Sequence, residues 1–129
     1  MSKINNNSFL VTGGAGFVGS YLVEELLTHK PSKIYIIDNL FRGSYENMES
    51  FIGDPAVEFV KGDIRDKGLI DQYMSKSDYC FHLAALRINA CAANPAEGFD
   101  VMVKATFDLV EAAKKHKIKK LIYSSSASV

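Results

Sequence analysis

The feature that most constrains the fold is a glycine-rich turn between an apolar run and a helical periodicity. Residues 8–12 (SFLVT) lead into the turn GGAGFVG at 13–19, and apolar residues recur at helical spacing over 20–27. This order predicts a strand, a tight turn and a helix. Glycine lets a backbone approach a diphosphate closely, and the unpaired N–H groups at a helix N-terminus bind phosphate. The turn therefore predicts a phosphate-binding site, with a β-α turn that holds no ligand as the alternative.

A carboxylate follows the second apolar run at the distance that a dinucleotide site needs. The run at 33–37 ends in Asp38, about 20 residues after the glycine turn. A carboxylate there accepts hydrogen bonds from both ribose hydroxyls and repels a 2′-phosphate, so it favours NAD over NADP. Arg42, four residues on, weakens that preference. The alternative is that Asp38 is only a turn residue at a strand end.

The rest of the chain alternates between strand and helix patterns. Further strands are predicted at 57–61, 79–83 and 121–123, and helices at 67–74 and 99–117, with a short helix as one interpretation of 45–51. Residues 87–97, which contain Asn94 and Pro95, are interpreted as a loop. Helical spacing places on one face of the long helix the residues Phe99, Met102, Val103, Thr106, Phe107, Val110 and Ala113.

Alternating strands and helices predict an α/β fold with a doubly wound parallel sheet. We expect one domain over residues 1–129, with about five strands in the order 3-2-1-4-5. The ligand crevice should then open at the carboxyl ends of the strands, where strand one lies between strands two and four. The glycine turn and Asp38 both fall at that edge.

Composition narrows the classes of partner and compartment. Lys and Arg number 15 and Asp and Glu number 15, so the formal net charge is zero and gives no reason to expect nucleic acid or an anionic membrane. Cys80 and Cys91 have no metal-ligand spacing and are expected to be plain thiols. No metal site is expected from this cysteine spacing. The polar N-terminus and the lack of a long uncharged apolar run predict a cytoplasmic protein.

Five short motifs together resemble one family. They are TGGAGFVG at 12–19, DNL at 38–40, GDIRD at 62–66, FHLAA at 81–85 and YSSSASV at 123–129. The chain is similar over about residues 9–129 to the extended short-chain dehydrogenase/reductases with a Rossmann-type fold. Within these it most resembles the NAD-dependent epimerase/dehydratases that act on nucleotide sugars.

The resemblance implies roles for individual residues. It implies that NAD is bound by Gly13, Gly16, Phe17, Val18, Gly19, Asp38, Asn39, Leu40, Arg42, Asp63, Ile64, Leu83, Ala84, Ala85, Arg87 and Ser124. Ser126 would hydrogen-bond the sugar oxygen that is oxidised, which makes it the catalytic candidate. Asp63 could instead be a helix N-cap, and Arg87 an ordinary surface arginine. His82 is expected to pack at its strand end without a catalytic role, and the Lys-rich residues 114–120 to be a solvated helix terminus rather than a binding patch.

Two departures from the family limit what the chain is expected to do. Met102 stands where the family has an Asn, and we expect that it cannot replace the amide's hydrogen bonds. Hydride transfer in the family also needs a Tyr-x-x-x-Lys pair. Tyr73 is followed by Ser77 at the fourth position, and Tyr123 is a strand residue, so neither supplies it.

The expected function is that of an N-terminal NAD-binding part of a nucleotide-sugar epimerase/dehydratase, inactive alone. A short non-catalytic nucleotide-binding or regulatory module is the alternative. An unpaired fifth strand and the long helix predict a homodimer or larger homo-oligomer.

Overall fold

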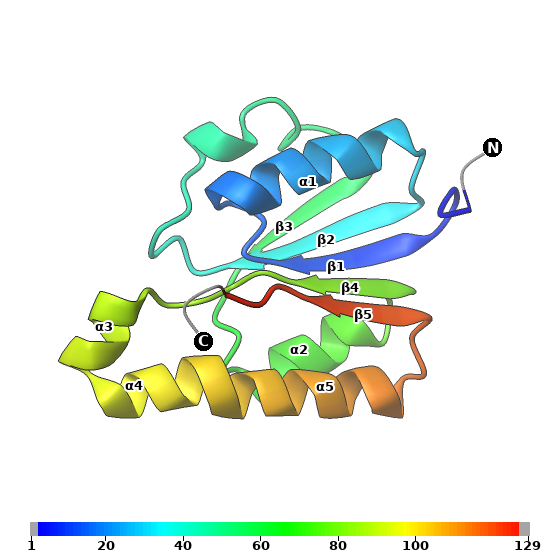
Figure 1. Ribbon diagram of the computed structural model, residues 1–129. Coiled ribbons are helices and arrows are strands. Elements are labelled where there is room, and N and C mark those ends of the chain that lie inside the picture. Colours follow the sequence, from blue (N-terminus) through cyan, green and yellow to red (C-terminus); the bar gives the residue numbers. More distant parts are fainter. Residues whose placement is uncertain (1–2, 127–129) are drawn as a thin grey trace.

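The core of the molecule is a parallel sheet in the predicted order. The computed structural model describes residues 3–126. The strands are β1 (Ser8–Thr12), β2 (Lys33–Asp38), β3 (Val57–Lys61), β4 (Tyr79–His82) and β5 (Lys120–Tyr123). They are hydrogen-bonded in the order β3-β2-β1-β4-β5, all parallel (Figure 1). Thr12, the last residue of β1, lies opposite Ile37 on one side and His82 on the other. The predicted Rossmann-type order is confirmed.

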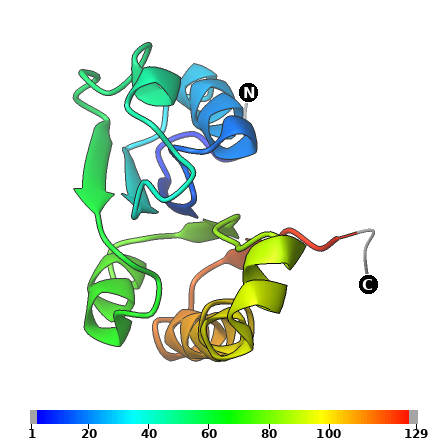
Figure 2. The same ribbon diagram turned by 90° about the vertical axis from the view of Figure 1, so that its left-hand side faces the viewer.

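Helices cover both faces of this sheet (Figures 1 and 2). Helix α1 (Phe17–Thr28) and the 3-10 turn η1 (Glu46–Met48) lie on one face, and α2 (Lys67–Met74) and α5 (Ala105–Lys115) on the other. Side chains alternate accordingly, because Phe9 and Val11 pack into the core beneath α1 while Leu10 packs into the core beneath α2 and α5. Helix α1 begins earlier than its apolar periodicity, and only a 3-10 turn forms within 45–51.

The prediction of a loop at 87–97 is wrong. This segment forms two short helices, α3 (Ile88–Ala93) and α4 (Pro95–Phe99). The Asn94 side chain accepts a hydrogen bond of 3.2 Å from the Glu97 backbone N–H, so it caps α4. Pro95 occupies the first turn, where a missing N–H costs nothing. The Asn-Pro pair therefore starts a helix here instead of marking a loop.

Helix α4 continues through a π-helical segment, η2 (Asp100–Lys104), directly into α5. The face that meets the sheet is formed by Val101, Ala105, Leu109, Ala112 and Ala113. The predicted apolar face lies largely on the other side of the helix. Its exposed members, here called the outer stripe, are Phe99, Val103, Phe107 and Val110.

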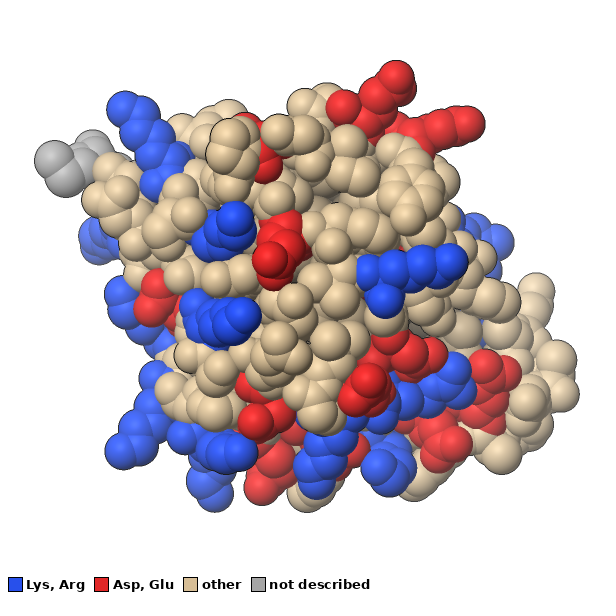
Figure 3. Space-filling model, turned by 180° about the vertical axis from the view of Figure 1, so that it is seen from behind, with Lys and Arg blue, Asp and Glu red and all other residues tan. Residues whose placement is uncertain are grey.

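Charges of both signs cover the surface. Seen from behind in Figure 3, basic and acidic side chains are interleaved over the lower part of the molecule. Within the Lys-rich segment, Lys114 and Lys115 lie in the last turn of α5, and Lys115 forms an ion pair of 3.1 Å with Asp71 of α2. Both cysteines are free thiols, and burial raises the pKa of the Cys80 thiol to about 12. Within residues 3–126, no helix has the length and apolar character needed to span a membrane.

Candidate functional site

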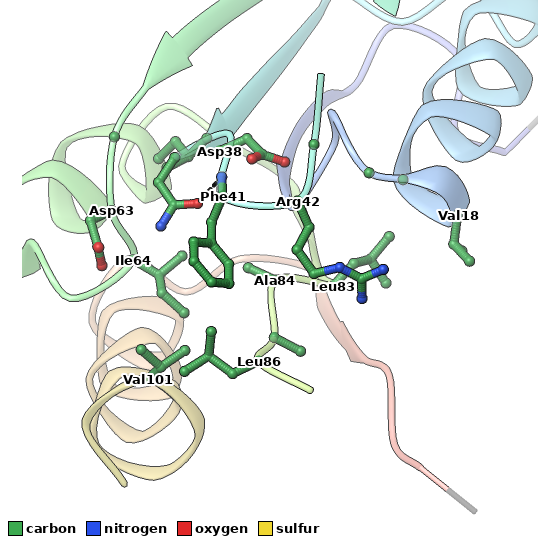
Figure 4. A pocket seen from close by; sticks show the side chains of 18 of the residues that line it. Val18, Asp38, Phe41, Arg42, Asp63, Ile64, Leu83, Ala84, Leu86 and Val101 are labelled. Atoms are coloured by element: carbon green, nitrogen blue, oxygen red, sulfur yellow. Dashed lines mark hydrogen bonds between the residues drawn. The ribbon is translucent and has the colours of Figure 1, made fainter. Parts of the chain in front are cut away.

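A pocket of about 360 Å³ opens at the carboxyl edge of the sheet, as the strand order predicts (Figure 4). Its walls come from the loops after β1, β2, β3 and β4 and from the helices α4 and η2. The predicted site residues that line it are Gly13, Gly16, Phe17, Val18, Gly19, Asp38, Asn39, Arg42, Asp63, Ile64, Leu83, Ala84 and Ala85. The structure thus gathers into one cavity residues from four of the five motifs.

The glycine turn has no space for side chains. Gly13 has φ of +76°, a left-handed conformation, and a Cβ there would lie 2.8 Å from the backbone nitrogen of Ala84. A Cβ on Gly19 would overlap the Gly13 carbonyl, so α1 can begin this close to β1 only with glycine. No side chain caps the N-terminus of α1. Its first N–H groups therefore face the pocket without a side-chain partner.

Asp38 is a buried carboxylate that the backbone holds in place. Its Oδ2 accepts a hydrogen bond of 3.0 Å from Ala15 N–H, and its Oδ1 one of 2.8 Å from Leu40 N–H. Each carboxylate oxygen can accept a second bond. Asp38 is thus a turn residue at the end of β2, as the alternative prediction had it. Its carboxylate can also accept further hydrogen bonds in the pocket.

The loop after β2 contacts the glycine turn at Ala15, the residue whose N–H binds Asp38. The Ala15 carbonyl accepts hydrogen bonds from Ser44 N–H at 3.1 Å and Asn47 Nδ2 at 2.9 Å. A Cβ on Gly43 would lie 2.8 Å from the Ala15 Cβ, so this loop packs directly on the turn. Asp38, Ala15 and the 43–47 segment form one hydrogen-bonded unit.

An ion network crosses the pocket from the loop after β3 to α4. Arg65 donates to both oxygens of Asp63, at 2.9 Å from Nε and 2.7 Å from Nη2, and its Nη1 lies 3.5 Å from Glu97. Hydrogen bonding from Arg65 holds the pKa of the Asp63 carboxyl below its usual range. Asp63 is not a helix cap, because Asp66 accepts the capping bond from Leu69 N–H.

Thr12 and His82 hold the 83–85 segment against the pocket. The Thr12 hydroxyl oxygen accepts from Leu83 N–H at 3.1 Å and Ala84 N–H at 3.2 Å. With both lone pairs used, its proton must go to His82 Nδ1, 2.7 Å away. The opposite ring nitrogen, Nε2, lies 3.2 Å from the Thr106 hydroxyl. Burial lowers the pKa of His82 to about 4, so the ring is neutral and packs at its strand end, as predicted.

Met102 has a polar contact that the sequence did not predict. Its Sδ accepts a hydrogen bond of 3.2 Å from the Leu86 backbone N–H. A thioether is only a weak acceptor, so the expectation that methionine cannot replace the hydrogen bonds of the family's amide stays a prediction. This contact joins the π-helical segment to the pocket wall.

Four predicted site residues lie outside the pocket lining: Leu40, Arg87, Ser124 and Ser126. Leu40 has φ of 61° and packs against the core beneath α1. Arg87 is the N-cap residue of α3, and Ser124 extends the β4–β5 pairing through a 3.3 Å bond from its N–H to the His82 carbonyl. Of the last motif, residues 127–129 lie outside the described part.

The pocket is also lined by residues that were not among the predicted site residues: Ile37, Phe41, Gly43, Asn47, Gly62, Arg65, Leu86, Glu97 and Val101. Arg65 and Gly62 belong to the GDIRD motif and could have been chosen from it. Glu97 was missed because its helix was taken for a loop.

Comparison with known proteins agrees with this geometry. The model of the NAD dependent epimerase/dehydratase family matches residues 9–129. The chain belongs to this family. A curated relative, the Bifunctional protein GAL10 of Candida maltosa, is 36% identical over 132 residues, which cover 98% of this chain and 86% of that protein.

Two solved structures share the architecture. A UDP-N-acetylglucosamine 4-epimerase from Methanobrevibacter ruminantium M1, in complex with UDP-N-acetylmuramic acid, is 35% identical with a TM-score of 0.89. The enzyme WbmF of Bordetella bronchiseptica, in complex with NAD+, is 32% identical with a TM-score of 0.87. These matches cover 97% and 99% of this chain but only 39% and 38% of those proteins. The family member described here thus corresponds to the NAD-binding portion of such enzymes.

Proposed function

We propose that this chain binds NAD in the pocket and is the cofactor-binding part of a nucleotide-sugar epimerase. The observation that carries the proposal is the cavity in which the glycine turn, the N-terminus of α1 and the carboxylate of Asp38 meet. Similarity to a 4-epimerase and to an enzyme solved with NAD+ supports it.

The residues of the pocket fit the parts of the cofactor. The close approach of Gly13 to Ala84 leaves a backbone cradle, and the N–H groups of α1 suit a diphosphate. Asp38 has acceptor capacity for the ribose hydroxyls and would repel a 2′-phosphate. Asp63 and Ile64 lie at the far end of the pocket, where we place the adenine.

In an epimerase the bound cofactor supplies hydride transfer with the sugar. We propose that this chain binds and orients the cofactor while Ser126 hydrogen-bonds the sugar oxygen. The segment after β4 and the serines after β5 leave neighbouring strands at the same sheet edge. Leu83, Ala84, Ala85 and Ser124 would therefore border the nicotinamide side.

Calorimetry of the chain with NAD and with NADP tests the proposal. We expect NAD to bind more tightly, and Asp38→Ala to weaken NAD by about 1.5–3 kcal/mol for each charged hydrogen bond lost. Asp71→Ala, which removes a carboxylate of α2 outside this pocket, is the matched control. NADP binding at least as tightly as NAD would contradict the role of Asp38.

We further propose that two copies of the chain associate through the outer stripe. Phe99, Val103, Phe107 and Val110 follow one another at helical spacing and are between 43% and 63% exposed. A contiguous apolar surface of this kind is stabilised by burial against a partner. Light scattering should give a dimer or larger species for the wild type and a smaller mass for Phe107→Glu. A wild-type monomer at micromolar concentration would contradict this.

A further inference from the structure

Lysines gather at the amino edge of the sheet, the edge opposite the pocket. Because the strands are parallel, their starts and the ends of α1, α2 and α5 all lie at this edge, on the right in Figure 1. Figure 3 shows basic side chains gathered on the left, which is the same edge seen from behind. Eight lysines of these segments, here called the basic edge, are Lys3, Lys30, Lys33, Lys76, Lys114, Lys117, Lys119 and Lys120. The sequence presents only those within 114–120 as a cluster, and the fold adds the other four.

Hydrogen bonds hold separate parts of the basic edge side by side. Asn6 N–H donates to the Lys30 carbonyl at 3.0 Å, and Lys119 Nζ donates to Asn7 Oδ1 at 2.6 Å. The N-terminal turn, which carries Lys3, therefore lies between the loop before β2 and the start of β5. Lysines from three distant segments thus form one surface.

The positive charge of this surface is not neutralised by neighbouring carboxylates. None of the eight lysines forms an ion pair with another residue of the described range 3–126. Lys115, beside them, is paired with Asp71 at 3.1 Å. The carboxylates of the same segments are those of Glu25, Asp54 and Asp78. Lysines therefore outnumber carboxylates at this edge by eight to three.

Helix dipoles account for only part of this cluster. A cation in the last turn of a helix is favourable, and Lys114 has such a position in α5. Helices α1 and α2, in contrast, have no basic residue in their last turns. Lys30, Lys117 and Lys120 lie beyond the helix ends, in loops or at a strand start. Their charge is available to a partner.

The composition of the basic edge favours an array of lipid phosphates over a nucleic acid. Its cations are all lysines, which attract phosphate as hydrated point charges, and none of the chain's arginines belongs to it. Its aromatic rings are already occupied, because Lys76 Nζ lies 5.1 Å from the Tyr73 ring centroid and Lys119 Nζ lies 5.9 Å from that of Tyr79. Nucleobases would therefore find no open ring on which to stack.

We propose that the basic edge binds an anionic lipid surface through charge alone. None of the exposed large apolar side chains of the described residues lies in these segments, so no group inserts into the bilayer. The lysines stay at the level of the headgroups, where each is attracted by the negative surface potential. The pocket opens at the opposite edge of the sheet and faces solution in this orientation. The inference goes beyond the proposed cofactor function and does not depend on it.

Co-sedimentation with vesicles tests the proposal. Vesicles of equimolar phosphatidylcholine and phosphatidylserine should sediment the wild-type chain at low salt, and vesicles of phosphatidylcholine alone should not. Each lysine contributes about fivefold to the binding constant, so Lys30→Gln/Lys117→Gln/Lys120→Gln should bind roughly a hundredfold more weakly. Lys120→Gln alone should lose about fivefold. Added salt should release the wild type, because exposed charges are screened.

A matched control removes three lysines outside the basic edge. Lys61→Gln/Lys67→Gln/Lys104→Gln changes the net charge by the same amount at the end of β3, the start of α2 and the end of η2. It should keep the wild-type affinity for the vesicles. Thermal unfolding should show both triple variants folded, since the substituted side chains are exposed.

Four results would overturn the proposal. They are an absence of wild-type binding to the phosphatidylserine vesicles, equal binding to phosphatidylcholine alone, an equal loss of affinity in the two triple variants, and tighter binding of a single-stranded oligouridylate than of the vesicles at the same salt. The last result would assign the basic edge to nucleic acid. Because the assay contains no NAD, its outcome is separate from that of the cofactor titrations.

Discussion

The two sides of the pocket are built differently. On the turn side, residues 13–19 and 38–47, the contacts are made by glycines and by bonds to backbone groups. At Ala15, for example, the N–H donates to the Asp38 carboxylate, and the carbonyl accepts from Ser44 N–H and from the Asn47 side chain. On the wall side, residues 82–106 together with Thr12, side chains make the decisive contacts. Examples are the Thr12–His82 bond and the Met102–Leu86 bond.

The difference determines which substitutions each side tolerates. A backbone cradle fails when any side chain is added, because the neighbouring groups cannot move apart independently. A wall held by side chains loses one hydrogen bond at a time, at about 0.5–1.5 kcal/mol for a neutral bond. We therefore expect large, all-or-none effects on the turn side and graded effects on the wall side.

The largest effect is expected for Gly13→Ala. A methyl group there would require a left-handed conformation and would lie 2.8 Å from Ala84 N. Strain of this kind costs about 1–3 kcal/mol, and the displaced turn should no longer bind NAD detectably. Chemical denaturation and calorimetry measure the two effects. Gly53→Ala is the control, since a Cβ there meets nothing within 4 Å. Unchanged NAD binding in Gly13→Ala would contradict the expectation of all-or-none effects on the turn side.

The same difference explains how far the sequence could predict the structure. The alternation of strands and helices and the glycine turn follow from local patterns, the strand order follows from the rules of the doubly wound fold, and the carboxylate of Asp38 follows from its spacing. The wall side depends on contacts between distant residues, such as the bond between His82 and Thr106, 24 positions apart. No local sequence pattern predicts a hydrogen bond between two residues so far apart.

Local patterns also have more than one structural use. Asn94 and Pro95 match a loop signal and an N-cap followed by Pro equally well. In the structure Asn94 caps α4, and Gly98 of this helix lies close to Cys91 of α3. The outer stripe satisfies helical periodicity as well as the buried face does, so hydrophobicity alone could not orient the helix. Phe41 was not predicted because it belongs to none of the five motifs.

On the wall side, the next effect concerns the pH dependence of stability and leaves the turn intact. Because the pKa of His82 falls from 6.5 to about 4 on burial, the unfolded chain binds a proton that the folded chain excludes. Stability is therefore fully present above pH 6.5 and falls as the pH drops toward 4, by about 3 kcal/mol. Urea denaturation across this range measures it. His82→Asn should flatten the slope, and an equally steep slope in that variant would assign the loss to other groups.

A still smaller effect is expected at Met102. Met102→Leu keeps the volume but removes the acceptor of the Leu86 N–H, which should cost about 1 kcal/mol of stability and loosen the pocket wall. Met102→Asn offers an amide acceptor in its place. Amide hydrogen exchange at Leu86 should therefore be faster in the leucine variant than in the wild type and the asparagine variant. Equal exchange in all three would show that the thioether contact contributes nothing.

The smallest effect distinguishes Arg42 from Arg87, the two arginines that the family resemblance assigns to the cofactor. Arg42 lies on the turn side and lines the pocket, whereas Arg87 is the N-cap residue of α3 on the wall side and does not. A screened charge outside the cavity contributes little, so Arg87→Ala should change NAD affinity by less than about twofold. Titration of Arg87→Ala and Arg42→Ala with NAD under one buffer makes the comparison direct. Equal losses of NAD affinity in the two variants would contradict this expectation. They would mean that the wall side moves onto the diphosphate when NAD binds. The side-chain contacts of the wall would then have to rearrange, while the backbone contacts of the turn side stay fixed.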